Sequence, residues 1–534
     1  MPAPQMEQPE SANRQIARST LVVMAAMIAS QLIGLLAKSL VGSAFGTGAE
    51  SEAFFAANRF SEILFNLVAG GALGSAFIPT FTGFIAKDQR RRAWRLASAV
   101  ACLVTLILSL FALISAVFAP WIVRHVLAPG FAAADPAKEA LTIVLLRLQL
   151  PSAAIFGLSG LMMGVLNAHQ RFLLPALAPA MYALGWVLGV LVLAPSLGIQ
   201  GLAWGVVIGA LMHLAVQLPH FLRLPARELR LTLGLDDPAV REVGRLMAPR
   251  LLGVAVVQLN FLLNTYLASL QPQGSLAAIS LAFPLMIMPQ AAIAQSAAIA
   301  ALPTFSAQAA LGKLGEMRAS LAATLRGVLL LAIPASLGLM LLREPVVALI
   351  YQRSEFDAAS TALVAWALLW YAAGLVGHSV VEVVSRAFYA LHDTRTPVAV
   401  GVAAMSLNLV FSLTLPGVFI RVGWLPHGGL ALANSLATFL EMIALLWLMR
   451  RRLDGLAGRS LWGAVGQAGL AALGMGAVLW LWLAATPGLA QAWRALGGVA
   501  LGGALYGLAL VVLRVREVGL MIAAVGRRMR RAAD

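Results

Sequence analysis

The amino-acid sequence predicts an all-α polytopic membrane protein with about 14 transmembrane helices. Hydrophobic residues make up 60% of the 534 positions and charged residues only 11%, and the mean hydropathy is +0.87. A soluble domain of this size carries about a quarter charged residues. Apolar runs of roughly 20 residues, the length that crosses a bilayer, recur from end to end. We therefore interpret the chain as a bundle of membrane helices.

Polar residues precede the first apolar run. Because they are polar, residues 1–17 are predicted to form a disordered cytoplasmic N-terminus. No short apolar core with a small-residue cleavage site follows them, so we do not expect a secretory signal peptide. The last stretch, 514–534, mixes basic and apolar residues, which predicts a cytoplasmic amphipathic helix or a solvated end. Between them we place fourteen spans, at 18–44, 54–86, 96–123, 140–166, 172–195, 200–220, 246–269, 276–307, 327–342 (with a possible earlier start), 359–389, 397–415, 428–449, 461–485 and 495–513.

The basic residues are distributed unevenly between the predicted loops. The chain carries 38 Lys and Arg residues against 22 Asp and Glu, a net charge of +16. Most of the basic residues fall in alternate loops and at the two ends, the pattern that places basic segments in the cytoplasm. Both termini are therefore predicted to be cytoplasmic. The excess charge then faces anionic membrane lipids, and a nucleic acid partner is not expected.

A sequence motif occurs twice along the chain. The segment "FIPTF", which contains Pro79, returns as "ALPTF" around Pro303, 224 residues later. Pro120 and Pro345, each at the equivalent end of a span, are 225 residues apart. These pairs indicate a duplication into two parallel six-helix lobes with a substrate path between them, which is typical of transporters. The predicted organisation is an N-lobe at 18–224, a cytoplasmic linker at 225–245, a C-lobe at 246–450 and two further helices within 461–513.

Ionisable residues of the first lobe gather around the first two spans. Lys38 lies late in the first span, Glu52 in the loop that follows, and Arg59 and Glu62 near the start of the second. Arg59 and Glu62 are three residues apart, which places them on one helical face. Ionisable groups at membrane depth usually face a cavity or a partner. We predict a polar substrate-binding mouth here, with snorkelling of Lys38 and Arg59 to the interface as the alternative.

Two further arginines lie deeper within predicted spans. Arg147 precedes Pro151 and Arg250 follows Pro249, and a proline frees backbone carbonyls and bends a helix. Cations beside such a bend suit a diphosphate or another anion. The alternative is that each arginine donates hydrogen bonds to the freed carbonyls.

The second lobe carries a polar stripe on one helix. His378, Glu382 and Arg386 follow one another at intervals of four residues. This spacing predicts a Glu382–Arg386 ion pair, which we favour over a proton relay. Glu441 stands alone within the twelfth span and is a candidate for proton or cation coupling, or for burial in its neutral form.

Several classes of chemistry have no sequence signal. The chain contains no G-x-x-x-x-G-K-[ST] phosphate loop, no His/Cys cluster and no visible nucleophile–base arrangement. We therefore expect no catalytic residues, metal site or cofactor, and assign the chain to secondary transporters rather than enzymes. The driving force would be an ion gradient, the membrane potential or a partner.

Five segments in this order resemble the MviN/MurJ family of lipid II flippases, within the multidrug/oligosaccharidyl-lipid/polysaccharide exporter superfamily. They are "FGTGAESEAFFAANR" (45–59), "APWIVRHVLAPGF" (119–131), "GVLNAHQRFLLPALAP" (164–179), "VQLPHF" (216–221) and "RAFYALHDTRTP" (386–397). The resemblance covers nearly the whole chain. It implies transfer of an undecaprenyl-diphosphate-linked peptidoglycan precursor between leaflets of a bacterial inner membrane by alternating access, with cell-wall synthesis enzymes as partners.

The chain departs from the family pattern where that pattern places charges. Gln31 and Ala37 occupy positions that align with family arginines, and Lys38 replaces an acid. Glu52 is an acidic residue at a position where the family pattern also has an acidic residue. Uncharged residues stand at further positions where the family pattern has charges, namely Phe65, Asn66 and Gly70 in the second span and Phe283 and Pro284 in the eighth.

Three functions follow from these residues. A flippase requires the cations of the first lobe and a groove for the polyprenyl tail, for which the last two spans are the candidates. An exporter of another lipid-linked polysaccharide unit or of an amphipathic small molecule requires a coupling carboxylate, Glu382 or Glu441. A non-transporting paralogue, acting as a scaffold, requires none of these charges.

Overall fold

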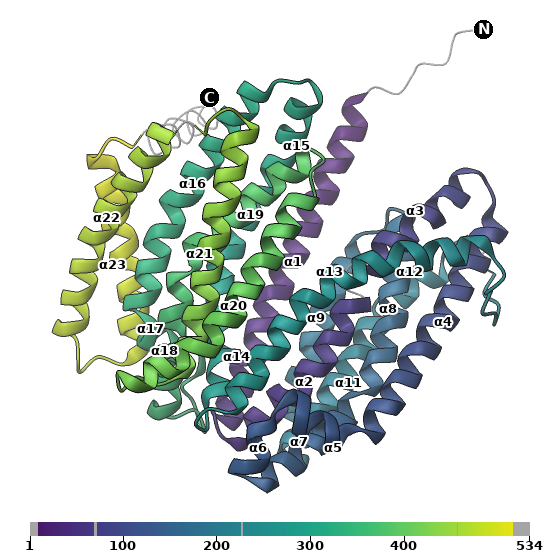
Figure 1. The fold of residues 1–534 in the computed structure, drawn as a ribbon, viewed down its shortest axis with the longest axis horizontal. Helices are drawn as coiled ribbons and strands as arrows, with labels where there is room; N and C mark the ends of the chain where they lie inside the picture. The colour runs from purple at the N-terminus through teal and green to yellow at the C-terminus, as the bar shows by residue number, and fades with distance from the viewer. Residues whose placement is uncertain (1–8, 69–71, 226–227, 457, 516–534) are drawn as a thin grey trace, which may run out of the picture. The chain divides into compact units, whose positions relative to one another are not determined.

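A computed structural model describes residues 9–68, 72–225, 228–456 and 458–515, and every regular element in these ranges is helical (Figure 1). Eleven helices in this part of the chain are long and apolar enough to cross a membrane, or thirteen if each of two bent pairs counts as one span. The shorter apolar helix Ala76–Ala86 lies in the predicted second span. The predicted all-α polytopic fold is confirmed, and the exact fourteen-span layout stays a prediction.

The chain folds as two compact units, and the boundary between them in the sequence lies after Leu270. Unit 1 contains α1 (Pro9–Phe45), α2 (Ala49–Val68), α3 (Ala72–Ala86), α4 (Arg90–Val117), α5 (Ala119–Ile122), α6 (Pro129–Ala134), α7 (Pro136–Gln149), α8 (Pro151–Ala168), α9 (Leu173–Leu188), α10 (Ala194–Leu197), α11 (Ile199–Ala215), α12 (Leu218–Leu222) and α13 (Pro238–Ser269). Unit 2 contains α14 (Ser275–Gln290), α15 (Ser296–Ala310), α16 (Leu314–Leu341), α17 (Arg343–Tyr351), α18 (Ala358–Ala373), α19 (Leu375–Ala390), α20 (Arg395–Arg421), α21 (His427–Arg452), α22 (Gly458–Ala485) and α23 (Gln491–Val512). Single π-helical turns occur at Val123–Leu127, Gly189–Leu193 and Ala291–Gln295.

The N-terminus differs from the prediction. Residues 1–17 were expected to be disordered, but α1 already begins at Pro9; residues 1–8 lie outside the described part. The polar stretch after Pro9 contains no glycine or further proline, so nothing in it interrupts the helix that continues from the first span. Proline itself fits the first turn of a helix, because its missing N–H would have no partner there. Most of the predicted basic tail, at 516–534, also lies outside the described residues.

The segment that joins the predicted lobes is shorter than expected. The predicted linker, 225–245, includes the start of α13 at Pro238. The Asp237 side chain caps this helix by accepting a hydrogen bond from the Ala239 backbone N–H at 3.0 Å. α13 then packs against α2 and α3 and belongs to unit 1, whereas the prediction assigned it to the second lobe.

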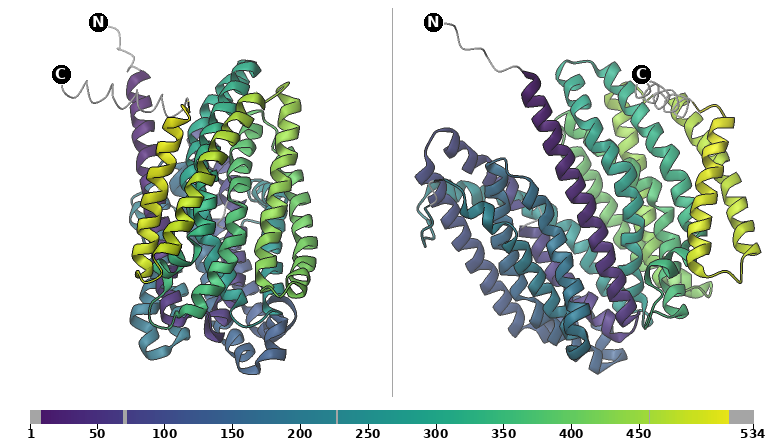
Figure 2. Two further views of the ribbon diagram at one scale, coloured as in Figure 1. Left: turned by 90° about the vertical axis from the view of Figure 1, so that its left-hand side faces the viewer. Right: turned by 180° about the vertical axis from the view of Figure 1, so that it is seen from behind.

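The succession of helices is consistent with the predicted duplication. Pro79 lies inside α3 and Pro303 inside α15, two helices of 15 residues. Each is followed by a helix of 28 residues, α4 or α16. The ninth span thus begins at Leu314, earlier than 327, as the sequence allowed. The helices outside the duplication, α22 and α23, pack side by side in unit 2 and contact α16 and α17 (Figures 1 and 2).

Glycines let α9 and α11 approach each other closely. A Cβ atom at Gly205 of α11 would lie 2.6 Å from the carbonyl oxygen of Gly185 in α9 and 2.8 Å from the Cα of Gly189 in the π-helical turn that follows α9. No real Cβ tolerates such distances, so the two backbones pack with small residues between them, a common device in membrane bundles.

We therefore expect Gly205→Ala to lower the free energy of unfolding by about 1–3 kcal/mol, because the added methyl overpacks this contact. Thermal unfolding of the purified protein measures the change. Gly503→Ala on α23 is the control, since no atom lies within 4 Å of its added Cβ. There the higher helix propensity of alanine should stabilise by up to about 1 kcal/mol. Equal effects at both glycines would contradict this account of the packing.

Candidate functional site

Three of the predicted site residues meet in unit 1. Lys38 extends from α1, and Arg59 and Glu62 from α2, a helix that contacts α1. The Arg59 guanidinium donates to the Glu62 carboxylate at 2.7 Å, as their spacing of three residues predicted. The charges of both residues act on Lys38. Two basic side chains and one carboxylate therefore lie within electrostatic range of one another, and we call these three residues the Lys38 cluster.

Neighbouring residues hold the Lys38 cluster in place. The Asn58 side-chain amide donates to Glu62 at 2.9 Å, so this carboxylate accepts from two consecutive residues of α2. The Arg59 guanidinium carbon lies 5.3 Å from the ring centre of Phe261 on α13, within the range of a cation–π contact. The charge of Glu62 also acts on Tyr182 of α9. The cluster is thus bounded by α1, α2, α9 and α13.

The Lys38 cluster retains capacity to bind a ligand. The side chains of Arg59 and Glu62 are 23% and 31% exposed, so neither is sealed in the core. The Arg59 Nε is buried and has no hydrogen-bond partner within the described part of the chain. A buried donor normally has a partner. Because a guanidinium matches phosphate oxygens in a planar, two-pronged arrangement, an anionic group suits this donor.

Glu52, the fourth predicted residue of the first lobe, has a different environment. Its carboxylate forms a buried ion pair with Lys138 of α7, and the two side chains are only 2% and 7% exposed. The Lys138 ammonium also lies 3.9 Å from the ring centre of Phe131 on α6. Glu52 therefore joins α2 to α7 and is not presented to a ligand. The prediction that it binds substrate stays untested, but the geometry favours a structural role.

Arg147 and Arg250 do not join the Lys38 cluster. Arg147 is exposed on α7 and donates to the Ala116 carbonyl at 2.9 Å, one of the last carbonyls of α4. Arg147 thus satisfies a free carbonyl at the end of another helix, whereas the predicted alternative was a carbonyl freed by the neighbouring proline. Arg250 is exposed on α13, which bends by 46° between Pro238–Ala248 and Gly253–Ser269.

The polar stripe of unit 2 contains the predicted ion pair. The Arg386 guanidinium donates to the Glu382 carboxylate at 2.8 Å and 3.3 Å, which confirms the pairing. His378, one turn earlier on α19, contacts the Asn434 side-chain oxygen at 3.1 Å. Each of these groups already has a partner on α19 or α21, which favours a structural role, and the prediction that Glu382 and Arg386 couple transport to an ion stays untested.

Glu441 is the isolated carboxylate of unit 2. It is partly buried on α21, and its Oε1 lies 3.5 Å from the position that a Cβ at Gly401 of α20 would occupy. It makes no hydrogen bond or ion pair to any residue that the structure describes. A carboxylate at membrane depth without a partner is suited to taking up a proton or cation.

Aromatic packing occupies positions where the family pattern has charges. Phe65 of α2 lies edge-on to Phe156, with ring centres 4.6 Å apart. Phe283 of α14 packs against Tyr371 at 5.2 Å. Ala37 is buried beside Lys38 in α1, and Gly70 lies outside the described residues. At Phe65 and Phe283, aromatic contacts stand where the family resemblance led us to expect charges.

Sequence reasoning missed the residues that support the charged groups. They are Asn58, Lys138, Tyr182 and Phe261. The Asp135–Pro136 dipeptide could have revealed that Lys138 lies in the first turn of a helix, since Asp135 caps α7 and proline occupies its first position. No local pattern could have paired Lys138 with Glu52, which lies 86 residues earlier.

A family model and individual relatives all point to the same protein family. A family model described as lipid II flippase MurJ matches residues 41–490. The lipid II flippase MurJ of Burkholderia cenocepacia is 29% identical over 440 residues, which cover 82% of this chain and 84% of that protein. The probable lipid II flippase MurJ of Vibrio cholerae is 29% identical over 524 residues, covering 94% and 97%.

Solved structures share the fold. A lipid II flippase MurJ in an inward closed conformation matches with a TM-score of 0.78 at 21% identity, covering 92% of this chain and 98% of that one. An inward-facing multidrug resistance MATE family transporter of the MOP superfamily matches with a TM-score of 0.64 at 16% identity, covering 81% and 98%. Because the family model spans from the end of α1 to the loop before α23, this chain belongs to the lipid II flippase MurJ family.

Proposed function

We propose that this protein moves lipid II, a diphosphate-linked peptidoglycan precursor, from the inner to the outer leaflet of a bacterial inner membrane. The observation that carries the proposal is the family match over residues 41–490, together with relatives named for this activity that are covered over most of their length. The substrate itself is lipid-linked, so cell-wall synthesis enzymes that make and consume it are the expected partners. Both termini face the cytoplasm in this proposal, following the positive-inside pattern of the loops.

In the proposed mechanism, the Lys38 cluster binds the diphosphate. Without substrate, Glu62 holds Arg59 through the ion pair at 2.7 Å. A diphosphate carries more negative charge than one carboxylate, so it competes for Arg59 and Lys38 together. The buried Arg59 Nε supplies a donor that no protein group uses in the described structure. Alternating access then releases the headgroup on the other side of the membrane.

Glu441 is proposed as the coupling group of unit 2. We expect Glu441→Gln to reduce transport driven by an ion gradient at least tenfold while substrate binding persists, since glutamine cannot exchange a proton or bind a cation by charge. Flux in proteoliposomes with and without a gradient measures this. Glu382→Gln is the matched control, because Glu382 is already paired with Arg386, and it should retain most transport. Equal loss in both variants would contradict the assignment of coupling to Glu441 alone, and loss only in Glu382→Gln would assign coupling to the stripe.

Complementation tests the proposed function. The chain is expressed in a bacterium whose own lipid II flippase can be switched off, and its membrane insertion is verified in the same cells. Growth after depletion is the expected result. Insertion without rescue would reject lipid II as the substrate. An exporter of a small amphipathic molecule, the activity suggested by the MATE-like fold, would then be tested by whether it needs Glu441 but not Arg59.

A further inference from the structure

Residues 228–237 form an extended loop that lies along α4. At its start, Glu228 pairs with Arg91 at 3.6 Å, and the Arg230 backbone N–H donates to the Ser98 hydroxyl at 3.1 Å. At its end, the Asp237 carboxylate lies 4.0 Å from Arg95. The loop therefore leaves and rejoins the basic end of α4, and its tip extends along the apolar part of that helix.

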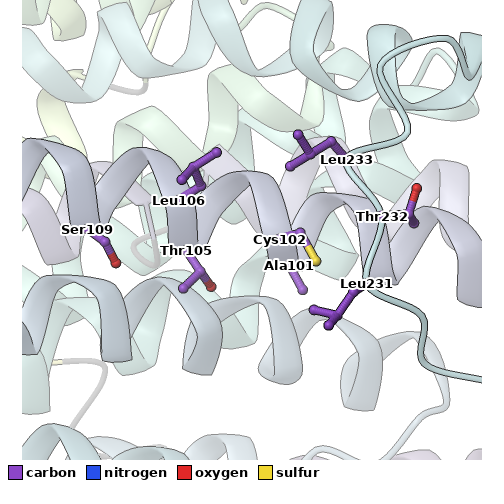
Figure 3. A pocket seen from close by; sticks show the side chains of 8 residues that line it. All are labelled: Ala101, Cys102, Thr105, Leu106, Ser109, Leu231, Thr232 and Leu233. Carbon is purple, nitrogen blue, oxygen red and sulfur yellow. The ribbon is translucent and has the colours of Figure 1, made fainter.

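The tip of this loop and α4 enclose an open hollow of about 690 Å³. Figure 3 shows the lining side chains, from Ala101 to Ser109 on α4 and from Leu231 to Leu233 on the loop. Apart from two hydroxyl-bearing threonines, one serine and Cys102, these side chains are hydrocarbon. The hollow is thus a mostly apolar groove within unit 1.

The depth of the groove along α4 places it at the level of acyl chains. Arg95 is the last basic residue before the apolar run of α4. Cys102 and Ser109 follow it by 7 and 14 residues, about 10 and 21 Å at the helical rise of 1.5 Å per residue. Half of a bilayer, counted from the headgroup surface to the midplane, is about 20–22 Å deep. An acyl chain whose headgroup lies near Arg95 would therefore run along this part of the helix.

The exposed residues of the loop suit hydrocarbon rather than water. Leu231 is 99% exposed, and the leucines at alternate positions on either side of it, Leu229, Leu233 and Leu235, are also exposed. Exposure of each leucine to water costs about 1.5–3 kcal/mol relative to burial. Four leucines at one side of a membrane helix are therefore best satisfied by lipid.

The basic end of the same helix suits an anionic headgroup. Arg90, Arg91 and Arg92, together with Asp88 and Gln89, line a second hollow of about 590 Å³ at the start of α4, and Arg90 pairs with Asp88 at 3.1 Å. The Arg91 side chain is 91% exposed, and Arg92 donates only to the neutral Gln89 side chain, at 3.4 Å. Arg92, and Arg91 through the exposed face that its contact with Glu228 leaves open, are therefore accessible to a phosphate at the membrane surface, where each basic residue contributes to the binding of anionic lipid.

We propose that the loop 228–237 and α4 form a binding site for an anionic diacyl phospholipid of the surrounding leaflet. The phosphate contacts Arg91 and Arg92, and one acyl chain lies in the groove between Cys102–Ser109 and Leu231–Leu233. The leucines of the loop insert into the same leaflet and anchor the segment that connects α12 to α13. This site requires only that the chain spans a membrane, so it does not depend on which substrate is transported.

Retained lipid tests the groove. The full chain is reconstituted in nanodiscs with phosphatidylglycerol and phosphatidylcholine, extracted, and its bound lipids are counted by native mass spectrometry. We expect selective retention of phosphatidylglycerol, at least fivefold lower in Ser109→Trp, which fills the groove. Leu110→Trp is the control, because Leu110 is exposed on the same helix but does not line the groove. Equal retention in the two variants would overturn the proposal.

The headgroup contacts are tested separately. Arg91→Gln combined with Arg92→Gln should lower phosphatidylglycerol retention by roughly 25-fold, about fivefold for each arginine. The same double change at Arg450 and Arg451, on the basic end of α21, should leave it unchanged. Millimolar inorganic phosphate should not displace the lipid; displacement would show that the arginines bind free phosphate and not a lipid.

Membrane depth gives an independent readout. A nitroxide is attached at Leu231→Cys in a Cys102→Ser background, which removes the only native cysteine. We expect the nitroxide to be accessible to oxygen dissolved in the bilayer and shielded from a water-soluble nickel reagent. A label that the nickel reagent reaches freely would place the loop in water and overturn the proposal.

Discussion

Arg59→Ala is expected to abolish lipid II translocation. The Arg59 guanidinium forms an ion pair with the Glu62 carboxylate at 2.7 Å, and its buried Nε has no hydrogen-bond partner in the described structure. We therefore expect Arg59 to be the strongest anion-binding group of the Lys38 cluster. A hydrogen bond to a charged group contributes about 1.5–3 kcal/mol. Its loss lowers diphosphate affinity by roughly 10- to 150-fold. Lys38→Ala should have a smaller effect, since an ammonium cannot form the two-pronged contact.

Binding of lipid II to the purified variants measures this loss, and two variants serve as controls. Arg147→Ala removes an arginine that donates to the Ala116 carbonyl and does not contact the cluster, so it should retain near-native affinity. Arg59→Lys keeps the charge and should recover part of the binding. If Arg147→Ala lost as much affinity as Arg59→Ala, the assignment of the site to the Lys38 cluster would be wrong.

Lys138→Met is expected to be the most destabilising single change. It leaves the Glu52 carboxylate, 2% exposed, without its cationic partner in the core of unit 1. Removal of one partner from a buried ion pair costs about 3–5 kcal/mol. The double variant Glu52→Gln with Lys138→Met removes both charges and should recover much of the lost stability, because no isolated charge remains buried.

Thermal and denaturant unfolding of the purified chain measures these variants. Lys313→Met is the matched control: it breaks a pair with Glu316 at 2.9 Å whose side chains are more than half exposed. An exposed pair contributes about 0–1 kcal/mol. Destabilisation of the double variant equal to that of Lys138→Met would show that specific contacts, rather than the unpaired charge, account for the loss.

Local spacing allowed part of the site to be predicted. Pairs separated by three or four residues on one helix, such as Arg59–Glu62 and Glu382–Arg386, must share a helical face once the helix is recognised. Both pairs are present in the structure. The apolar runs predicted the membrane helices, because the thickness of the bilayer sets the length of a run that can cross it.

Contacts between distant segments could not be predicted. The burial of Glu52 depends on Lys138, which reaches it from α7, and nothing in the sequence near either residue identifies the other. Arg147 was equally ambiguous, since whether it faces a ligand or the end of α4 depends on how two helices pack. The early start of α1 at Pro9 shows that polar composition alone does not prevent a helix from continuing beyond the membrane.

The most direct test of the account measures lipid II at the outer leaflet. Cells depleted of their own flippase express either this chain or its Arg59→Ala variant, and an impermeant enzyme cleaves only the lipid II that has reached the outer surface. The account predicts cleavage with the native chain and background cleavage with the variant at equal membrane levels. Background cleavage with the native chain, or equal cleavage with both, would contradict the claim that the Lys38 cluster carries lipid II across the membrane.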